Sequence, residues 1–169
     1  MNALIPSKRK IDKSITNRLA SEGAVRKSNS WYIHTSETAL IINLQKSHYC
    51  SKYYMNIGIF LDDTVVDLGA FLPEFKADIR LRLSGLVPEQ SRYIFEEALD
   101  FDIVADDDNR ILVVLKIVND VLVPMLRIFA TRRGVLGAYR NGTLSAALIT
   151  KIGMQRLLAT AGKQDAQSY

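Results

Sequence analysis

Two arginines separated by a single residue, Arg80 and Arg82, carry the chemistry that the sequence favours most. Side chains two residues apart on a strand project from the same face, so both guanidinium groups could bind one carboxylate or phosphate. Two earlier strand-like segments add polar side chains to the same face of a sheet. The alternative is an ordinary solvated strand face, which carries similar residues. The predicted ligand-binding residues are Asn43, Gln45, Ser47, Tyr54, Asn56, Arg80 and Arg82.

These polar residues are positioned by segments in which apolar and polar side chains alternate. Residues 39–47, 53–61 and 77–83 have a period of two, which is typical of strands that bury one face. Another strand is predicted at 31–35. No helical segment separates the strands, so we expect roughly four antiparallel strands in a meander. The face predicted to be buried consists of Leu40, Ile42, Leu44, Met55, Ile57, Ile59, Ile79 and Leu81.

Helical periodicity flanks the predicted sheet on both sides. Residues 7–21 carry apolar residues at a spacing of four, which predicts an amphipathic helix. The sequence therefore predicts an α+β fold in one domain, 1–169, with a sheet region at 25–83 and a helical region at 89–161. Helices packed on one sheet face should leave the other face in contact with solvent. A last helix is expected at 143–161, with inward-facing Leu144, Leu148, Ile152 and Leu157.

The composition is that of a globular domain: 169 residues, 48% hydrophobic, with a net charge of +4. The single cysteine, Cys50, cannot form an intramolecular disulfide, so we expect a reducing compartment and a cytoplasmic location. The first residues are apolar and then basic, the reverse of a secretory signal, so no cleaved targeting peptide is expected. The apolar stretch 111–130 contains Lys116, Asp120 and Arg127, which predicts a buried helix and no membrane partner.

Other motifs do not support catalysis or a cofactor. His48 and Cys50 supply at most two metal ligands, and no predicted helix N-terminus activates Cys50 as a nucleophile. The acidic run 106–108 lacks the alternating ligands of a calcium loop. Glycines at 134–142 miss the dinucleotide and phosphate-loop spacings. We therefore predict no catalytic residue, no metal and no cofactor, and we leave enzymatic activity open while favouring its absence.

Nucleic acid is a weaker alternative partner. Basic residues crowd the predicted first helix, and aromatic residues of the predicted strands could stack on bases. No RNA-recognition consensus is present, and strand aromatics usually pack against their neighbours. The residues concerned are Lys8, Arg9, Lys10, Lys13 and Arg18, with Trp31, Tyr32, Tyr53 and Tyr54.

Three motifs resemble a known bacterial family. They are IINLQKS at 41–47, YYMNIGI at 53–59 and DIRLRL at 78–83, which follow Trp31-Tyr32 in order and spacing similar to those of the domain of unknown function DUF4304. The resemblance extends from about residue 11 to residue 158. It implies an uncharacterised bacterial protein, and it assigns no role to any residue.

The sequence thus favours a noncatalytic binding or interaction module. Its polar sheet face, or its apolar C-terminal helices, would hold a protein partner or a second copy of the chain. The first alternative is a small-anion binder or enzyme centred on Arg80 and Arg82, in which Gln45 and Asn56 orient the ligand. The second alternative is nucleic-acid binding.

Overall fold

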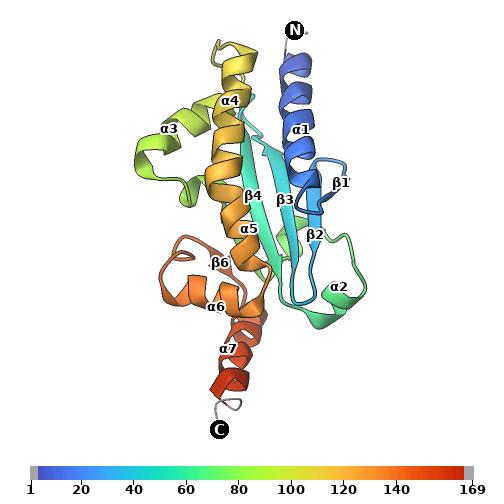
Figure 1. The fold of residues 1–169 in the computed structure, drawn as a ribbon. Helices are drawn as coiled ribbons and strands as arrows, with labels where there is room; N and C mark the ends of the chain where they lie inside the picture. The colour runs from blue at the N-terminus through green and yellow to red at the C-terminus, as the bar shows by residue number, and fades with distance from the viewer. Residues whose placement is uncertain (1–3, 166–169) are drawn as a thin grey trace.

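A computed structural model describes residues 4–165, so the ends of the predicted domain, 1–3 and 166–169, lie outside the described residues. The predicted α+β class is confirmed: an N-terminal helix, an antiparallel sheet and C-terminal helices follow one another (Figure 1). The helices are α1 (Leu4–Ala20), α2 (Asp63–Asp67), α3 (Glu89–Ala98), α4 (Asp107–Ile117), α5 (Val123–Phe129), α6 (Arg132–Arg140) and α7 (Lys151–Asp165). The strands are β1 (Val25–Lys27), β2 (Ser30–His34), β3 (Ala39–Lys46), β4 (Tyr53–Phe60), β5 (Ile79–Arg82) and β6 (Leu148–Ile149).

The sheet is the predicted meander, but it has six strands in the order β1-β2-β3-β4-β5-β6, not roughly four. The two unpredicted strands, β1 and β6, form the edges and are too short to show an alternation of apolar and polar residues. Every neighbouring pair is antiparallel. The register places Asn43 opposite Asn56, and Asn56 opposite Arg82. Polar residues from three strands therefore form one row across the sheet.

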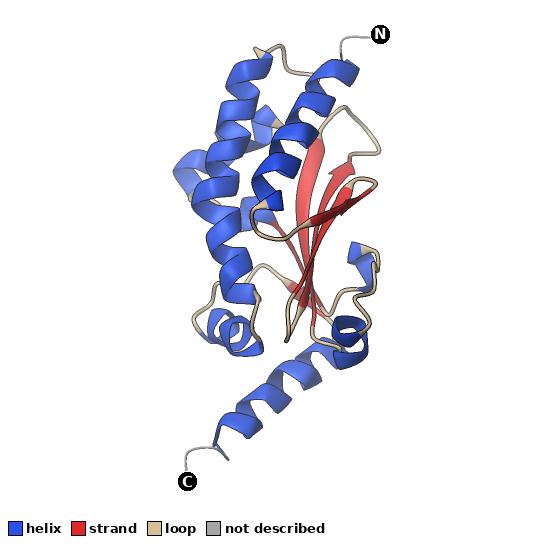
Figure 2. Cartoon of the chain, turned by 45° about the vertical axis from the view of Figure 1, so that its right-hand side comes forward, coloured by secondary structure: helices blue, strands red, loops and turns tan. Residues whose placement is uncertain are grey.

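The predicted apolar face is buried. All the residues expected there belong to the main hydrophobic cluster, together with residues of α1, α3, α4 and α5. Figure 2 shows these long helices on one side of the sheet. Trp31 of β2 has no exposed surface, and its indole Nε1 donates a hydrogen bond of 2.9 Å to Thr16 Oγ1 of α1. This bond satisfies the polar atom of the largest core side chain and helps to orient α1 on the sheet.

The sequence predicted that the opposite face of the sheet would contact solvent, but part of that face is covered. At one end, Tyr32, Ile41 and Phe60 form a second apolar cluster with residues of the connection between β4 and β5, including α2. Gly58 allows this connection to approach: a Cβ there would lie 2.7 Å from Ile41 Cγ2 and 2.9 Å from the Cβ of Ala77. Only the other end of this face remains open.

The last helix begins later than predicted. Residues 148 and 149 pair with β5 as β6, and α7 starts at Lys151, where Thr150 Oγ1 accepts a hydrogen bond of 2.9 Å from Gly153 N. A threonine in this position caps a helix and competes with helix continuation on its N-terminal side. Leu144 and Leu157 are buried as predicted, whereas Leu148 and Ile152 are exposed.

The apolar stretch at 111–130 forms most of one long rod made of α4, a π-helical turn (Val118–Leu122) and α5 (Figure 1). Pro124 lies in the first turn of α5 and has no N–H to donate. The pattern of backbone hydrogen bonds along the rod must therefore change just before this residue. The wider π turn supplies that change. None of the helices between residues 4 and 165 combines the length and apolarity needed to cross a bilayer.

Candidate functional site

An open groove of about 540 Å³ lies on the uncovered end of the polar sheet face. Its floor comes from β3, β4 and β5, and its walls come from the segments around Glu74, Ser84 and Leu148. Ser84 belongs to a short 3-10 helix, η2 (Leu83–Gly85), and Glu74 to another, η1 (Glu74–Lys76). This sheet-face groove is defined by its polar lining residues Gln45, Asn56, Glu74, Arg80, Arg82 and Ser84.

The structure brings together some of the predicted ligand-binding residues and separates others. Gln45, Asn56, Arg80 and Arg82 line the groove, and Tyr54 lies next to Arg82. Two other residues are used elsewhere. The Nδ2 of Asn43 donates to Ser30 Oγ at 2.8 Å, and Ser47 Oγ accepts from Tyr49 N at 3.2 Å in the turn after β3.

A pair of amides forms the middle of the floor. Asn56 is 6% exposed, and its Nδ2 donates a hydrogen bond of 2.8 Å to Oε1 of the exposed Gln45. The two residues face each other diagonally on β4 and β3. This bond fixes the orientation of both amides and directs the Gln45 NH₂ group away from Asn56, where it can donate to a ligand.

Arg82 is held by stacking on an aromatic ring. Its Cζ lies 4.0 Å from the centroid of the Tyr54 ring, while Lys52 Nζ lies 5.6 Å from the same centroid and 3.1 Å from Glu96 Oε2. Stacking leaves the edge of the guanidinium group, which carries the N–H donors, available for a ligand.

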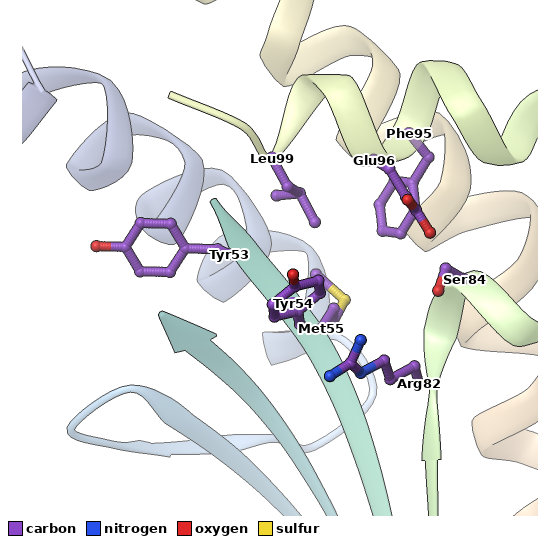
Figure 3. A pocket seen from close by; sticks show the side chains of 8 residues that line it. All are labelled: Tyr53, Tyr54, Met55, Arg82, Ser84, Phe95, Glu96 and Leu99. Carbon is purple, nitrogen blue, oxygen red and sulfur yellow. The ribbon is translucent and has the colours of Figure 1, made fainter. Parts of the chain in front are cut away.

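A small cleft on the other side of Arg82 separates it from α3 (Figure 3). The cleft has a free volume near 10 Å³, about the space of one water molecule. It is too small for an organic ligand. A ligand of Arg82 would therefore enter from the larger sheet-face groove.

Arg80 and Glu74 lie at the other end of the groove. Arg80 Nε is buried and has no hydrogen-bond partner among the described residues. Burial raises the pKa of Glu74, and the positive charge of Arg80 lowers it by less. Sequence reasoning missed Glu74, because only the return of the chain over the sheet brings it there. Gly58 was the available signal, since an isolated glycine within a strand often marks a close backbone approach.

Replacing Glu74 by glutamine is expected to stabilise the protein increasingly as the pH rises. Because burial raises the pKa of Glu74, the folded state binds this proton more tightly than the unfolded state. The contribution of Glu74 to the free energy of unfolding is therefore fully present below the ordinary glutamate pKa of about 4.3. It is lost as the pH rises through the raised pKa that Glu74 has in the folded state. Urea unfolding of both proteins from about pH 4 to pH 8 measures the difference. Parallel stability curves would contradict the assignment.

His34 and Cys50, for which no metal or catalytic site was predicted, lie in different parts of the sheet region. His34 Nε2 lies 3.1 Å from the carbonyl oxygen of Ala70, and its ring contacts Phe71 edge-on. Cys50 is an exposed free thiol in the turn between β3 and β4. Between residues 4 and 165, no three histidine, cysteine, aspartate or glutamate side chains gather in a way that could hold a metal ion.

Three of the five basic residues in the helix that suggested nucleic acid are paired with acidic residues. Lys8 Nζ lies 2.5 Å from Asp12 Oδ2, Lys10 Nζ lies 3.2 Å from Asp107 Oδ2, and Arg18 bonds Glu22 at 3.1 Å. These pairs lower the positive potential that attracts phosphate backbones. They weaken the case for α1 as a nucleic-acid surface.

Comparison with known protein families gives a match to most of the sheet region. The model of a family described as a domain of unknown function (DUF4304) matches residues 15–128, which include β1 to β5 and Glu74, Arg80 and Arg82. No curated protein and no solved structure matches the chain significantly. The wall formed by Leu148 lies outside the matched region.

Proposed function

Because the chain belongs to the family described as a domain of unknown function (DUF4304), which assigns no activity, we propose a function from its geometry. It is a noncatalytic binding protein whose sheet-face groove holds the anionic group of a ligand. The observation that carries this proposal is the pair Arg80 and Arg82, which line one groove and form no ion pair with any described residue.

Other charged residues that are buried in this protein have partners. Asp78 binds Arg156, Asp12 binds two cations, and Arg110 donates to backbone carbonyls. Asp12 also has a buried oxygen without a partner, Oδ1, but its Oδ2 binds Lys8 and Arg26. By contrast, the partly buried Arg80 has a buried Nε without an acceptor and no ion pair among the described residues. A buried donor without an acceptor costs free energy. Because Arg80 lines the groove, an anion bound there would compensate its positive charge. The contrast favours a ligand role for Arg80 over a structural one.

The size and polarity of the groove fit a small ligand. Its volume of about 540 Å³ lies within the range of about 300–1,000 Å³ found for small-molecule sites. Gln45 and Asn56 add neutral hydrogen-bonding groups beside the arginines. The polar lining contains no histidine, so the hydroxyl group of Ser84 has no histidine base in the groove to activate it, which supports binding without serine-type nucleophilic catalysis. The free thiol of Cys50 further supports a reducing compartment, such as a bacterial cytoplasm.

Substituting both arginines by glutamine is expected to weaken anion binding strongly. Each lost charge-assisted hydrogen bond costs about 1.5–3 kcal/mol, so affinity for inorganic phosphate or citrate should fall at least about tenfold in the Arg80→Gln, Arg82→Gln variant. Thermal shift and titration calorimetry measure the loss, because a ligand that binds only the folded state raises Tm.

The control removes the same charge from another surface. Arg133 and Arg140 are exposed on α6, so the Arg133→Gln, Arg140→Gln variant should bind as the wild type does. Equal losses of anion affinity in both double variants would show that the effect comes from net charge and not from the groove. Absence of any stabilisation of the wild type by phosphate, citrate or simple carboxylates would refute anion binding in the groove.

A further inference from the structure

One end of the sheet-face groove carries the carboxyl group of Glu74 beside Arg80, and the other end carries the guanidinium group of Arg82. Glu74 lies at the row of Gly58 and Arg80, since its Cγ is 3.4 Å from where a Cβ on Gly58 would lie and these two residues are paired across the strands. Arg82 lies one row further along β5, and its guanidinium group leans toward Tyr54, still further from Glu74. A carboxyl group and a guanidinium group therefore mark opposite ends of one cavity.

The register gives a scale for the separation of these charges. A strand advances about 3.3 Å per residue, so two to four residues correspond to about 7–13 Å. Gly58 and Tyr54, which mark the two ends, are four residues apart on β4. An α-amino acid, whose charged groups share one carbon atom, is too short to reach both ends. An extended chain of five or six carbons is long enough.

Glu74 has an incomplete environment for a carboxylate. It is half-buried in the groove wall, and between residues 8 and 161 no cation lies within ion-pair distance of it. Burial raises its pKa in spite of Arg80, so the loss of water outweighs the nearby positive charge. A ligand cation would replace the lost hydration and favour the ionised form.

The side of the groove between the two ends is apolar. Leu148 is paired with Arg80 across β5 and β6; it lines the groove and is 53% exposed. Ala146 lines the same wall. Methylene groups of a ligand would cover this surface and gain contact free energy there.

From this arrangement we propose that the ligand is dipolar, with an acidic group at Arg82, a primary ammonium group at Glu74 and an aliphatic chain along Leu148. This inference rests on the proposed anion-binding function and specifies its ligand class. The separation of about 7–13 Å selects ω-amino acids, or lysine-like chains with a terminal ammonium group, over short α-amino acids.

Three probes of equal chain length test the inference by titration calorimetry. They are hexanoate, 6-aminohexanoate and 2-aminohexanoate, which share the carboxylate and differ in whether and where they carry an ammonium group. The wild type is expected to bind 6-aminohexanoate about fivefold more tightly than the other two, since a partly exposed ion pair contributes about that factor. This comparison needs no variant, so it stands even if a substitution impairs folding.

Two variants then test which residue binds the ammonium group of the ligand and which binds its carboxylate. Glu74→Gln should bind all three probes with similar affinity, because it loses only the preference for the terminal ammonium group. Arg82→Gln should lose affinity for all three. Equal binding of the three probes by the wild type would overturn the dipolar ligand and leave anion binding intact. Binding of neither these probes nor phosphate would overturn both proposals.

Discussion

Replacing Arg110 by methionine is expected to lower the free energy of unfolding by roughly 2–4 kcal/mol. Arg110 is 4% exposed and has no carboxylate partner among the described residues; instead, its Nη1 donates to the carbonyl oxygens of Glu97, Ala98 and Asp100 at 3.2, 3.1 and 2.8 Å. Its Nη2 donates to the carbonyl oxygen of Ile103. The positive charge thus lies at the C-terminus of α3, where the helix dipole is negative.

Methionine keeps much of the side-chain length and apolar contact, so the loss measures the hydrogen bonds. The Arg110→Lys variant should recover only part of the lost free energy of unfolding, because an ammonium group cannot reproduce the planar arrangement of donors in a guanidinium group. Arg92→Met is the matched control: Arg92 is exposed and makes one hydrogen bond of 3.4 Å, so we expect a change within about 0.5 kcal/mol. Urea unfolding measures all three variants, and equal stability of Arg110→Met and Arg92→Met would contradict the capping role.

Replacing Arg110 should also change the candidate site. The segment that Arg110 holds is tied to β4, because Tyr53 N donates to the carbonyl oxygen of Leu99 at 2.8 Å and Phe101 N donates to that of Ser51 at 3.2 Å. Tyr54, on which Arg82 stacks, follows directly. Loosening the end of α3 should therefore weaken anion binding as well as stability.

The sheet could be predicted from the sequence because its strands have a strong period-two pattern. Leu40, Ile42 and Ile57 are buried against the helices, as that pattern requires, and four polar positions on the other face meet in one groove. The period of two assigns each side chain to a face, and the turns align the strands. The polar floor of the groove was thus accessible to sequence reasoning.

The walls of the groove were not accessible in the same way. Glu74 reaches the sheet through a connection of mixed composition, and the segment that carries Ala146 and Leu148 lacks the period of two that indicates a strand. The spacing of Leu144, Leu148 and Ile152 imitates a helix, yet β5 offers Leu148 and Ile149 backbone partners and Thr150 caps α7 instead. Tertiary hydrogen bonds thus overrode a local helical pattern.

Arg156→Met is expected to destabilise the protein by about 2–4 kcal/mol, because it removes the cation that compensates a buried carboxylate. Asp78 is 5% exposed; its Oδ1 lies 2.7 Å from Arg156 Nη1, and its Oδ2 accepts a bond of 2.7 Å from Leu61 N. Arg156 also binds Asp62. Since the Arg156 side chain is 32% exposed, water supplies part of the compensation, which keeps the expected loss below that of a fully buried pair.

A double-mutant cycle separates the buried charge from the rest of the arginine. Asp78→Asn keeps an oxygen acceptor for Leu61 N and removes the charge, so Asp78→Asn combined with Arg156→Met should be more stable than Arg156→Met alone. Lys116→Met breaks the exposed Lys116–Asp120 pair and should cost less than about 1 kcal/mol. Additive losses in the cycle would show that Arg156 stabilises by packing. A positive coupling would identify the charge on Asp78 as the reason that α7, β4 and β5 are held together at this end of the sheet.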